Sequence, residues 1–454
     1  MSVLNLYSSG TDAVIDRKQI IQAYRNNRAR TEAIFAMLTP DRYYESPIPL
    51  RHPPVFYEGH ISAFAVNLFL KRGLGHSALD SDLELLFARG IDPSDQTAMA
   101  KSTVDVWPTR GEVRRYAHRA DEAILGALAT GIIEDDNNPV LRLGQCVFSM
   151  LEHEVMHQET LLYMWHRFDP RQKIRQNGCE LMGVTSQPPT APTLVTIPTG
   201  TAKLGAAVAD IPFGWDNEFP LCPVEVPAFA IDVHNVTNAD FLSFIEARGY
   251  DDQSLWTTAA WERRTRTGRS HPLFWERIGG EWVWRSMFER VRLPAAWPVY
   301  VTHDEASAYA KWRGLRLPTE AEYHRAAYGT PSGVERSYPW GEDEPDETRG
   351  NFDFRHLDPV PVGWYPGGTS AWGVHELVGN GWEWTSTVFQ GFPGFEVMPS
   401  YPEYSADFFD GDHFVVKGAS PVTGRDLIRR SFRNWFRPDY PYVYATFRCV
   451  RNKS

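Results

Sequence analysis

Hydrophobic positions in the first part of the chain recur every three or four residues, which is the spacing of one face of an α-helix. One such pattern covers residues 12–38, and a second begins near His60, which it places in the first helical turn. A third follows Thr109-Arg-Gly-Glu112, a sequence that fits a capping box. A fourth starts at Asn137-Asn-Pro139. Four long helical patterns in about 170 residues predict a four-helix bundle, with a short helix and a loop at Ser81–Ala100.

The pattern changes after a proline-rich stretch, residues 185–192, which is unsuited to a helix or a central strand. Of the 16 tryptophans, only Trp107 and Trp165 precede it. Short runs that suit strands and helices then alternate, which predicts an α+β domain with buried aromatic residues. The strand-like runs are 193–198, 224–233 and 414–417, and the helical runs are 238–246, 303–312 and one opening at Pro318-Thr-Glu-Ala-Glu322. The predicted domain limits are 1–184 for the bundle, 185–192 for the linker and 193–454 for the second domain.

Composition narrows the class of protein. The 454 residues carry a net charge of −11, so they offer no field that would neutralise nucleic-acid phosphates. No apolar run of about 18 residues is present, and we expect no membrane span. The four cysteines form no close pair, so they do not indicate a disulfide framework. The N-terminus has no basic region followed by an apolar run. We therefore expect a cytoplasmic protein.

The strongest chemical signal lies in residues 151–162, where His153 and His157 stand four positions apart. On a helix these side chains leave the same face one turn apart and can share a metal ion. A single histidine on an apolar face is more often a core residue, but two at this spacing, with Glu154 and Glu159 nearby, favour metal binding. His60 offers a third imidazole from a second helix. Three protein ligands leave coordination positions open, as catalysis requires.

Two other interpretations fit the same residues. His153-Glu-Val-Met-His157 also matches the zinc metalloprotease pattern, in which Glu154 would be the general base. Against this, His166 lies nine residues after His157 and lacks the flanking glycines of a third zinc ligand. Imidazole suits both zinc and iron, so the residues leave the metal open. A binding module without chemistry is the third interpretation, and the presence of all three histidines argues against it.

Four motifs mark the second domain: Leu317-Pro-Thr-Glu-Ala-Glu322, Tyr338-Pro-Trp-Gly341, Leu377-Val-Gly-Asn-Gly-Trp-Glu-Trp-Thr385 and Phe447-Arg-Cys449. With these motifs, residues 190–452 resemble the formylglycine-generating-enzyme, or C-type-lectin-like, fold, although the cysteine pair that binds copper in those enzymes is missing. The first half resembles a DinB-type four-helix bundle.

The two domains in this order resemble the iron-dependent sulfoxide synthases of ergothioneine and ovothiol biosynthesis, and the related selenoneine synthases. The resemblance implies that His60, His153 and His157 bind a non-haem Fe(II) ion. It also implies that hercynine, which is trimethylhistidine, and dioxygen take the open positions, and that a small-molecule donor supplies selenium or sulfur.

Departures from the family motifs indicate a changed donor pocket. Val155 and Met156 replace two glutamines, Phe436 replaces an aspartate linked to glutamyl-cysteine binding, and Phe392 stands where a tyrosine is common. Residues 87–92 are also closer to the ovothiol and selenoneine branches. The stretch from Lys417-Gly-Ala-Ser-Pro421 through Ser431-Phe-Arg-Asn-Trp-Phe-Arg-Pro438 is most similar to selenoneine synthases, which join a selenosugar to hercynine. An ergothioneine-type reaction with cysteine or γ-glutamylcysteine is the alternative.

The resemblance also implies a set of substrate-contacting residues. A quaternary ammonium group suits an aromatic wall, although the same side chains could simply pack a tryptophan-rich core. Asn434 would contact a carboxylate or imidazole of the substrate, or would stabilise its own loop. Tyr442 and Tyr444 could replace the missing tyrosine as a source of a proton or an electron. The predicted substrate-binding residues are Met156, Trp382, Phe392, Asn434, Trp435 and Phe436.

Overall fold

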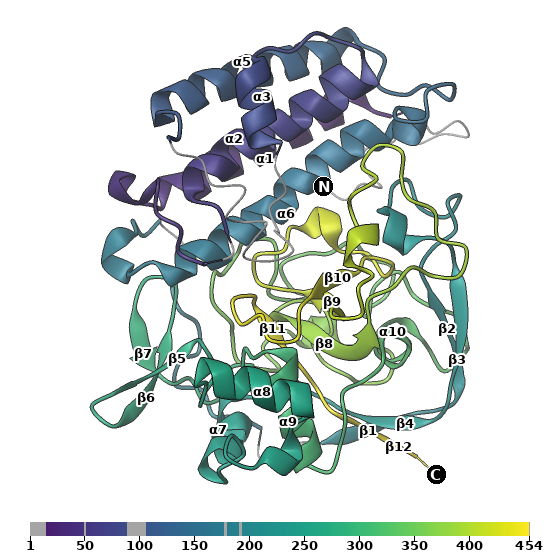
Figure 1. Cartoon of the computed structure of the whole chain (residues 1–454). Coiled ribbons are helices and arrows are strands. Elements are labelled where there is room, and N and C mark those ends of the chain that lie inside the picture. The colour runs from purple at the N-terminus through teal and green to yellow at the C-terminus, as the bar shows by residue number, and fades with distance from the viewer. Residues whose placement is uncertain (1–14, 50, 89–105, 177–178, 190–192, 454) are drawn as a thin grey trace. The chain divides into compact units, whose positions relative to one another are not determined.

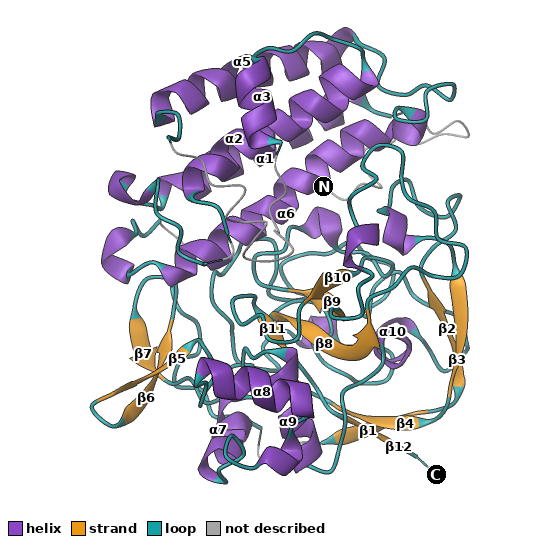
Figure 2. Ribbon diagram, viewed as in Figure 1, coloured by secondary structure: helices purple, strands orange, loops and turns teal. Residues whose placement is uncertain are grey.

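The computed structural model describes residues 15–49, 51–88, 106–176, 179–189 and 193–453 (Figure 1). The chain divides into two compact units. The first comprises Met1–Gln176 with Met398–Pro402, and the second comprises Asn177–Val397 with Glu403–Ser454. Long helices make up the first unit, and strands β1 to β12 all belong to the second (Figure 2). The predicted α+β class is confirmed, and the domain limits at residues 184 and 193 stay a prediction.

The first unit is the expected four-helix bundle. Helix α1 packs against α5 and α6, and α2 also packs against α5 and α6, so the four long helices form a closed ring of neighbours. No helix in the described part of the chain is both long and apolar enough to cross a bilayer. The helices of this unit are α1 (Arg17–Ala36), α2 (Pro54–Ala65), α3 (Ser81–Phe87), α5 (Arg110–Thr130) and α6 (Gln145–Arg167).

Two predicted helix starts are wrong. Helix α2 begins at Pro54 rather than near His60, because proline in the first helical position has the right φ and needs no hydrogen-bond acceptor. His60 therefore lies within the helix and not in its first turn. Helix α6 begins at Gln145 rather than at Asn137, because Leu143 and Gly144 adopt positive φ angles of 54° and 65° and interrupt the helix.

Other local predictions hold. The capping box of α5 forms as expected: Glu112 N–H donates to Thr109 Oγ1 over 3.3 Å, and the Glu112 carboxylate accepts from Thr109 N–H over 2.8 Å. Of the stretch Ser81–Ala100, the short helix α3 is present, and residues 89–100 lie outside the described residues. Past Ala65 the helix continues as a π-helical segment, η3 (Val66–Gly73).

The second unit contains four small sheets. The central one has the order β10-β9-β8-β11, in which β8 pairs antiparallel with β9 and parallel with β11. The others are β1-β4-β12, β5-β6-β7 and the β2-β3 hairpin. All three predicted strand-like runs contain strands. The bounds are β1 (Leu194–Ile197), β2 (Gly200–Leu204), β3 (Cys222–Val226), β4 (Phe229–Asp232), β5 (Trp275–Ile278), β6 (Glu281–Arg285), β7 (Arg290–Arg292), β8 (Gly381–Val388), β9 (Phe414–Ala419), β10 (Asn434–Phe436), β11 (Ala445–Thr446) and β12 (Val450–Asn452).

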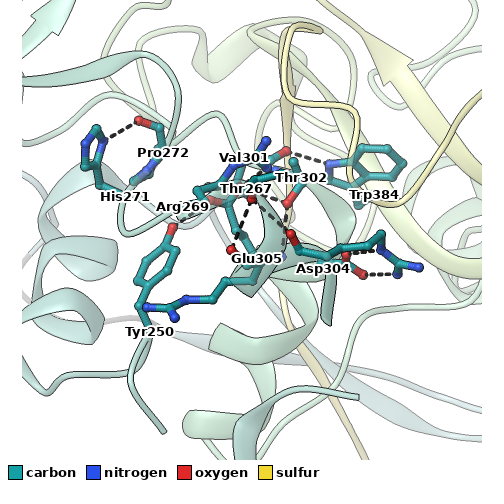
Figure 3. Close-up of polar contacts among 12 residues, drawn as sticks. Tyr250, Thr267, Arg269, His271, Pro272, Val301, Thr302, Asp304, Glu305 and Trp384 are labelled. Carbon is teal, nitrogen blue, oxygen red and sulfur yellow. Dashed lines mark hydrogen bonds and ion pairs between the residues drawn. The ribbon is translucent and has the colours of Figure 1, made fainter. Parts of the chain in front are cut away.

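Side-chain caps start the helices of this unit. At the start of α9, Thr302 donates to the Glu305 carboxylate through both its N–H and its hydroxyl, each over 2.8 Å. Tyr250 donates to the other oxygen of Glu305 over 2.7 Å, so this buried acid has two kinds of partner (Figure 3). Thr237 and Thr319 cap α7 and α10 in the same way. The helices are α7 (Asn238–Glu246), α8 (Thr258–Thr267), α9 (His303–Trp312) and α10 (Glu320–Tyr328).

A fully buried arginine ties the C-terminal end of the chain to β8. Arg448 forms a bidentate ion pair with Glu383, with both contacts at 2.7 Å. Its remaining N–H groups donate to the backbone oxygens of Asp232, Val233 and His375 and to Asn235 Oδ1. Every guanidinium nitrogen thus has a partner, which offsets the cost of burying the charge.

Replacing Glu383 with glutamine should destabilise the second unit by about 3 kcal/mol, because breaking a buried ion pair leaves an uncompensated charge. Urea unfolding followed by tryptophan fluorescence would measure the change in the free energy of unfolding. The matched control is Asp343→Asn, which breaks an exposed pair with Arg349 and should cost under about 1 kcal/mol. Equal effects of the two substitutions would contradict the prediction.

Candidate metal centre

Helices α6 and α2 bring three imidazoles together inside the first unit. His153 and His157 lie one turn apart on α6, and their Nε2 atoms are 3.0 Å apart. The His60 ring centroid on α2 is 5.1 Å from that of His153 and 4.9 Å from that of His157. One ligand atom from each residue lies within 4.8 Å of the others, and all three side chains are buried. The predicted convergence of these rings is therefore present.

The spacing suits a metal ion held by nitrogen ligands. A metal–nitrogen bond of about 2.1 Å and an angle near 90° between bonds place two ligand nitrogens about 3.0 Å apart. The Nε2 atoms of His153 and His157 have that separation. Two imidazole nitrogens this close, without an ion, would have to share one proton between them. The arrangement therefore fits adjacent coordination positions on one metal ion, with further positions left open.

Burial keeps the three imidazoles neutral, which leaves their lone pairs available. It lowers the pKa of His60 to about 4, against the smaller opposing effect of the Phe87 carbonyl. Burial likewise lowers the pKa of His153 well below its usual value, and proximity to His157 and His60 adds to the shift. The pKa of His157 falls for the same main reason, helped by His60 and the Arg51 guanidinium. A metal ligand must be deprotonated, so these environments favour metal binding at neutral pH.

The second nitrogen of each ring is treated differently. His60 Nδ1 lies 2.7 Å from the Phe87 carbonyl oxygen, so Nδ1 carries the proton and Nε2 presents its lone pair. The Nδ1 atoms of His153 and His157 are buried and have no hydrogen-bond partner in the described part of the chain. Instead, Phe64 stacks on His153 with 3.5 Å between ring centroids and 10° between ring planes. Tyr401 lies edge-on to Phe64, with 5.2 Å between centroids.

Only one of these aromatic neighbours can be inferred from the sequence. Phe64 stands four positions after His60, so a shared helix face could be inferred once both residues were placed on one helix. Tyr401 belongs to the segment Met398–Pro402, which joins the first unit from a distant part of the sequence. No local pattern marks that residue.

Glu154, the base that a zinc hydrolase would use, has other partners. It accepts a hydrogen bond from Thr31 Oγ1 over 2.6 Å and forms an ion pair with Arg28 over 3.1 Å. Both partners lie on α1, and the carboxylate is buried. An acid held in this way is poorly placed to activate a water molecule on the metal, which weighs against the hydrolase interpretation.

Most of the predicted substrate residues lie in the second unit. Trp382 on β8 is 1% exposed, and its ring lies 6.0 Å from that of Phe432. Phe392 is buried beneath the Arg433 guanidinium, which lies 4.2 Å from its ring centroid. Met156, in contrast, lies on α6 in the first unit and is partly buried. Their contact with a substrate stays a prediction.

The stretch Asn434–Phe436 forms the edge strand β10. Asn434 Oδ1 accepts from the N–H of Trp435 over 2.9 Å, so the amide does stabilise its own backbone. Trp435 stacks on Phe389 with 4.1 Å between centroids, and Phe436 stacks on Tyr440 at 6.0 Å. All three β10 residues are only partly buried, which leaves part of each side chain accessible.

The two proposed tyrosines differ in environment. Tyr444 is buried, with its ring 5.6 Å from that of Tyr300 and 5.8 Å from that of Phe274. Tyr442 is only partly buried and packs against Tyr440 at 5.1 Å. Burial in an aromatic core makes Tyr444 the less accessible of the two. A catalytic role for either residue stays a prediction.

Comparison with known proteins identifies the family. A family model for the Sulfatase-modifying factor enzyme 1-like domain matches residues 181–453, and one for the DinB superfamily matches residues 23–161. The hercynine oxygenase of Mycobacterium tuberculosis is 38% identical over 74% of this chain and 76% of its own length. This chain belongs to the hercynine oxygenase family. The predicted family resemblance and the two-domain fold are therefore confirmed.

Other relatives match different shares of the chain. The hercynine oxygenase of Mycolicibacterium thermoresistibile is 37% identical over 75% of this chain and 74% of that protein. Ergothioneine biosynthesis protein 1 of Schizosaccharomyces pombe is 29% identical over 92% of this chain and 54% of its own length. The solved structure of PvdO from Pseudomonas aeruginosa is 19% identical, with a TM-score of 0.40 over 60% of this chain and all of that one. As a member of the hercynine oxygenase family, the chain is an enzyme of the oxygenase class, and its selenoneine specificity stays a prediction.

The buried histidines should make the metal-free protein sensitive to acid. Below pH of about 6.5 the unfolded chain takes up protons on these residues, whereas folded His60 stays neutral down to pH of about 4. The free energy of unfolding should therefore fall as pH decreases through this window, by up to about 1.4 kcal/mol per pH unit for each histidine. Urea midpoints between pH 7.5 and 5.0 would measure the slope.

The matched control is His60→Gln, whose amide can still donate to the Phe87 carbonyl. In this variant the free energy of unfolding should change less steeply with pH, by the contribution of one proton, whatever the absolute stability of the variant. An unchanged slope would show that His60 does not titrate differently in the folded and unfolded states.

Proposed function

We propose that this protein is an Fe(II)- and dioxygen-dependent enzyme that joins selenium to the imidazole ring of hercynine. The proposed donor is a selenosugar, and the proposed step gives the selenoxide that joins the sugar to hercynine. Selenoneine, the proposed end product, would follow when the sugar–selenium bond is broken and a separate thiol reductant supplies two electrons to the selenium. The observation that carries the proposal is the buried triad of neutral imidazoles, with two Nε2 atoms 3.0 Å apart, in a chain 38% identical to a hercynine oxygenase.

His60, His153 and His157 would hold the iron. Three neutral ligands preserve its +2 charge and leave positions for a substrate imidazole and for dioxygen. Bound iron would supply the redox chemistry that lets dioxygen react with a C–H bond and a selenol. Zinc lacks that redox chemistry, and Glu154 is already engaged by Thr31 and Arg28, so iron is preferred to a zinc hydrolase site.

The overall step balances with dioxygen as the only oxidant. The imidazole C–H and the donor Se–H bonds break, a C–Se bond forms, and the two hydrogen atoms leave in one water molecule. The second oxygen atom stays on selenium as a selenoxide, so dioxygen takes up four electrons. A thiol donor would give the corresponding sulfoxide by the same balance, which is the ergothioneine-type alternative.

The protein's own part is positioning and selection. The buried environment of the triad excludes water from the reacting atoms, and holding the partners in contact can lower the barrier substantially. In the second unit, Trp435 and Phe436 present partly exposed aromatic faces, which suit the trimethylammonium group of hercynine. Phe436 carries no charge, so it favours an uncharged sugar over an amine-bearing thiol as the donor.

A donor comparison tests the proposal. With Fe(II) loaded anaerobically and hercynine saturating, we expect kcat/KM to be at least tenfold higher for a selenosugar than for cysteine or γ-glutamylcysteine, measured by product mass spectrometry and dioxygen uptake. Preference for a thiol would support the ergothioneine-type alternative.

His153→Ala should retain the fold by circular dichroism and lose at least a hundredfold in turnover, because it loses a metal ligand. Full activity without iron would exclude the proposal.

The identity of residue 436 should set donor preference. Phe436→Asp restores an acid that can pair with the amine of γ-glutamylcysteine, so its kcat/KM for that donor should rise at least threefold while that for the selenosugar falls. Phe436→Leu serves as the uncharged control and should not gain γ-glutamylcysteine activity. Identical donor ratios in wild type and Phe436→Asp would show that this position does not contact the donor.

A further inference from the structure

Within the described part of the chain, two of the three triad histidines have no protein partner for the hydrogen bond that usually orients a metal-bound imidazole. Such ligands nearly always donate their other N–H to a carbonyl, a carboxylate or a water molecule, which fixes the ring plane. His60 has this partner in the Phe87 carbonyl, at 2.7 Å. The Nδ1 atom of His153 is buried and has no such partner among the residues that the structure describes. Among the described residues, the plane of the His153 ring is therefore restrained by packing and not by a hydrogen bond to a protein group.

Phe64 is in position to restrain the His153 ring. Its ring lies parallel to the His153 imidazole, with 3.5 Å between centroids and 10° between planes, so the two faces are in full van der Waals contact. Turning the imidazole about its Cβ–Cγ bond would drive a ring edge into the phenyl face. Phe64 follows His60 by one turn of α2, and their centroids are 6.4 Å apart. The same helix therefore provides one triad residue and the ring that packs on another.

A segment from far along the sequence supports this stack. Met398–Pro402 belongs to the first unit, where Arg72 donates to the Ser400 carbonyl over 2.8 Å. Tyr401 in this segment meets Phe64 edge-on, with 5.2 Å between centroids and 69° between planes. It also lies edge-on to His153 at 6.4 Å. Edge-to-face contact of this kind is favourable between aromatic rings and restrains the Phe64 ring.

We propose that Phe64 is a positioning residue of the metal centre. Its stacking orients the His153 ring, as the hydrogen bond to the Phe87 carbonyl orients His60, and Tyr401 restrains Phe64 in turn. The inference deepens the proposed function and rests on it only in taking the triad as a metal site. Because the stack needs a planar face, metal affinity should depend on an aromatic ring at position 64 and not merely on an apolar side chain.

Metal binding by the full-length protein tests this without substrate. Co(II) serves as a spectroscopic probe, with affinity measured by chelator competition and geometry by visible absorption. Phe64→Leu should weaken Co(II) binding about tenfold or more, which is the usual loss when the group that orients a ligand is removed, and should alter the spectrum. Phe64→Tyr keeps the face and should bind within about threefold of wild type.

Phe35→Leu is the control. Phe35 is a buried phenylalanine of the first unit that packs edge-on against Trp165 at 5.7 Å, and no ring contact to the triad is found for it among the described residues. The Phe35→Leu variant makes the same change in side chain and should leave Co(II) affinity unchanged. Wild-type affinity and spectrum in Phe64→Leu would overturn the inference. If Phe64→Leu does not fold, Tyr401→Leu provides the test. Weaker Co(II) binding with an altered absorption spectrum would support the positioning role of Phe64, and unchanged Co(II) affinity and spectrum would overturn it.

The outcome is separable from that of the proposed reaction. A wild type that binds Co(II) but does not turn over hercynine would contradict the proposed function and leave the role of Phe64 intact. Normal turnover of hercynine, together with a Co(II) affinity that does not change on substitution of Phe64, would contradict the role of Phe64 and leave the proposed function intact.

Discussion

The chemistry of this protein depends on holding three imidazoles together, uncharged, inside a helical bundle. Burial accomplishes both tasks, since it removes the water that would stabilise the protonated rings and packs them against neighbouring helices. The 3.0 Å between the Nε2 atoms of His153 and His157 is the length of a hydrogen bond between two neutral rings, and it is also the separation of two nitrogen ligands on one ion. An ion between them turns that approach into coordination. The cost of placing polar rings in the core is therefore best understood as the cost of a binding site.

Local sequence predicted the part of this site that local geometry controls. The four-residue spacing of His153 and His157 suffices to place both rings on one face, whatever surrounds the helix. The position of His60 was harder, because the helix signal began with its apolar stripe and missed the start set by Pro54. The start of α6 is harder to predict, because Leu143 adopts a positive φ angle for which leucine has no preference, although Gly144 beside it does.

Contacts between distant parts of the chain could not be predicted from periodicity. Tyr401 reaches Phe64 through a five-residue segment that carries no helical or strand pattern. Arg448 and Glu383 belong to motifs that indicated the fold, yet nothing in either motif reveals that the two side chains pair in the core. These interactions arise from the topology of the second unit, where β8 and the C-terminal stretch of the chain approach the same buried region.

The departures from family motifs gain physical meaning from this division of tasks. The three histidines that could hold a metal ion lie together and are buried. Phe392 and Phe436, in contrast, are apolar residues at positions where the family resemblance leads us to expect groups that recognise or activate a donor. The Phe392 ring packs beneath the Arg433 guanidinium and has no hydroxyl that could donate a proton. Under the proposed function, the apolar side chains at 392 and 436 would alter which donor is joined to the imidazole, while the three histidines would keep the means of joining it.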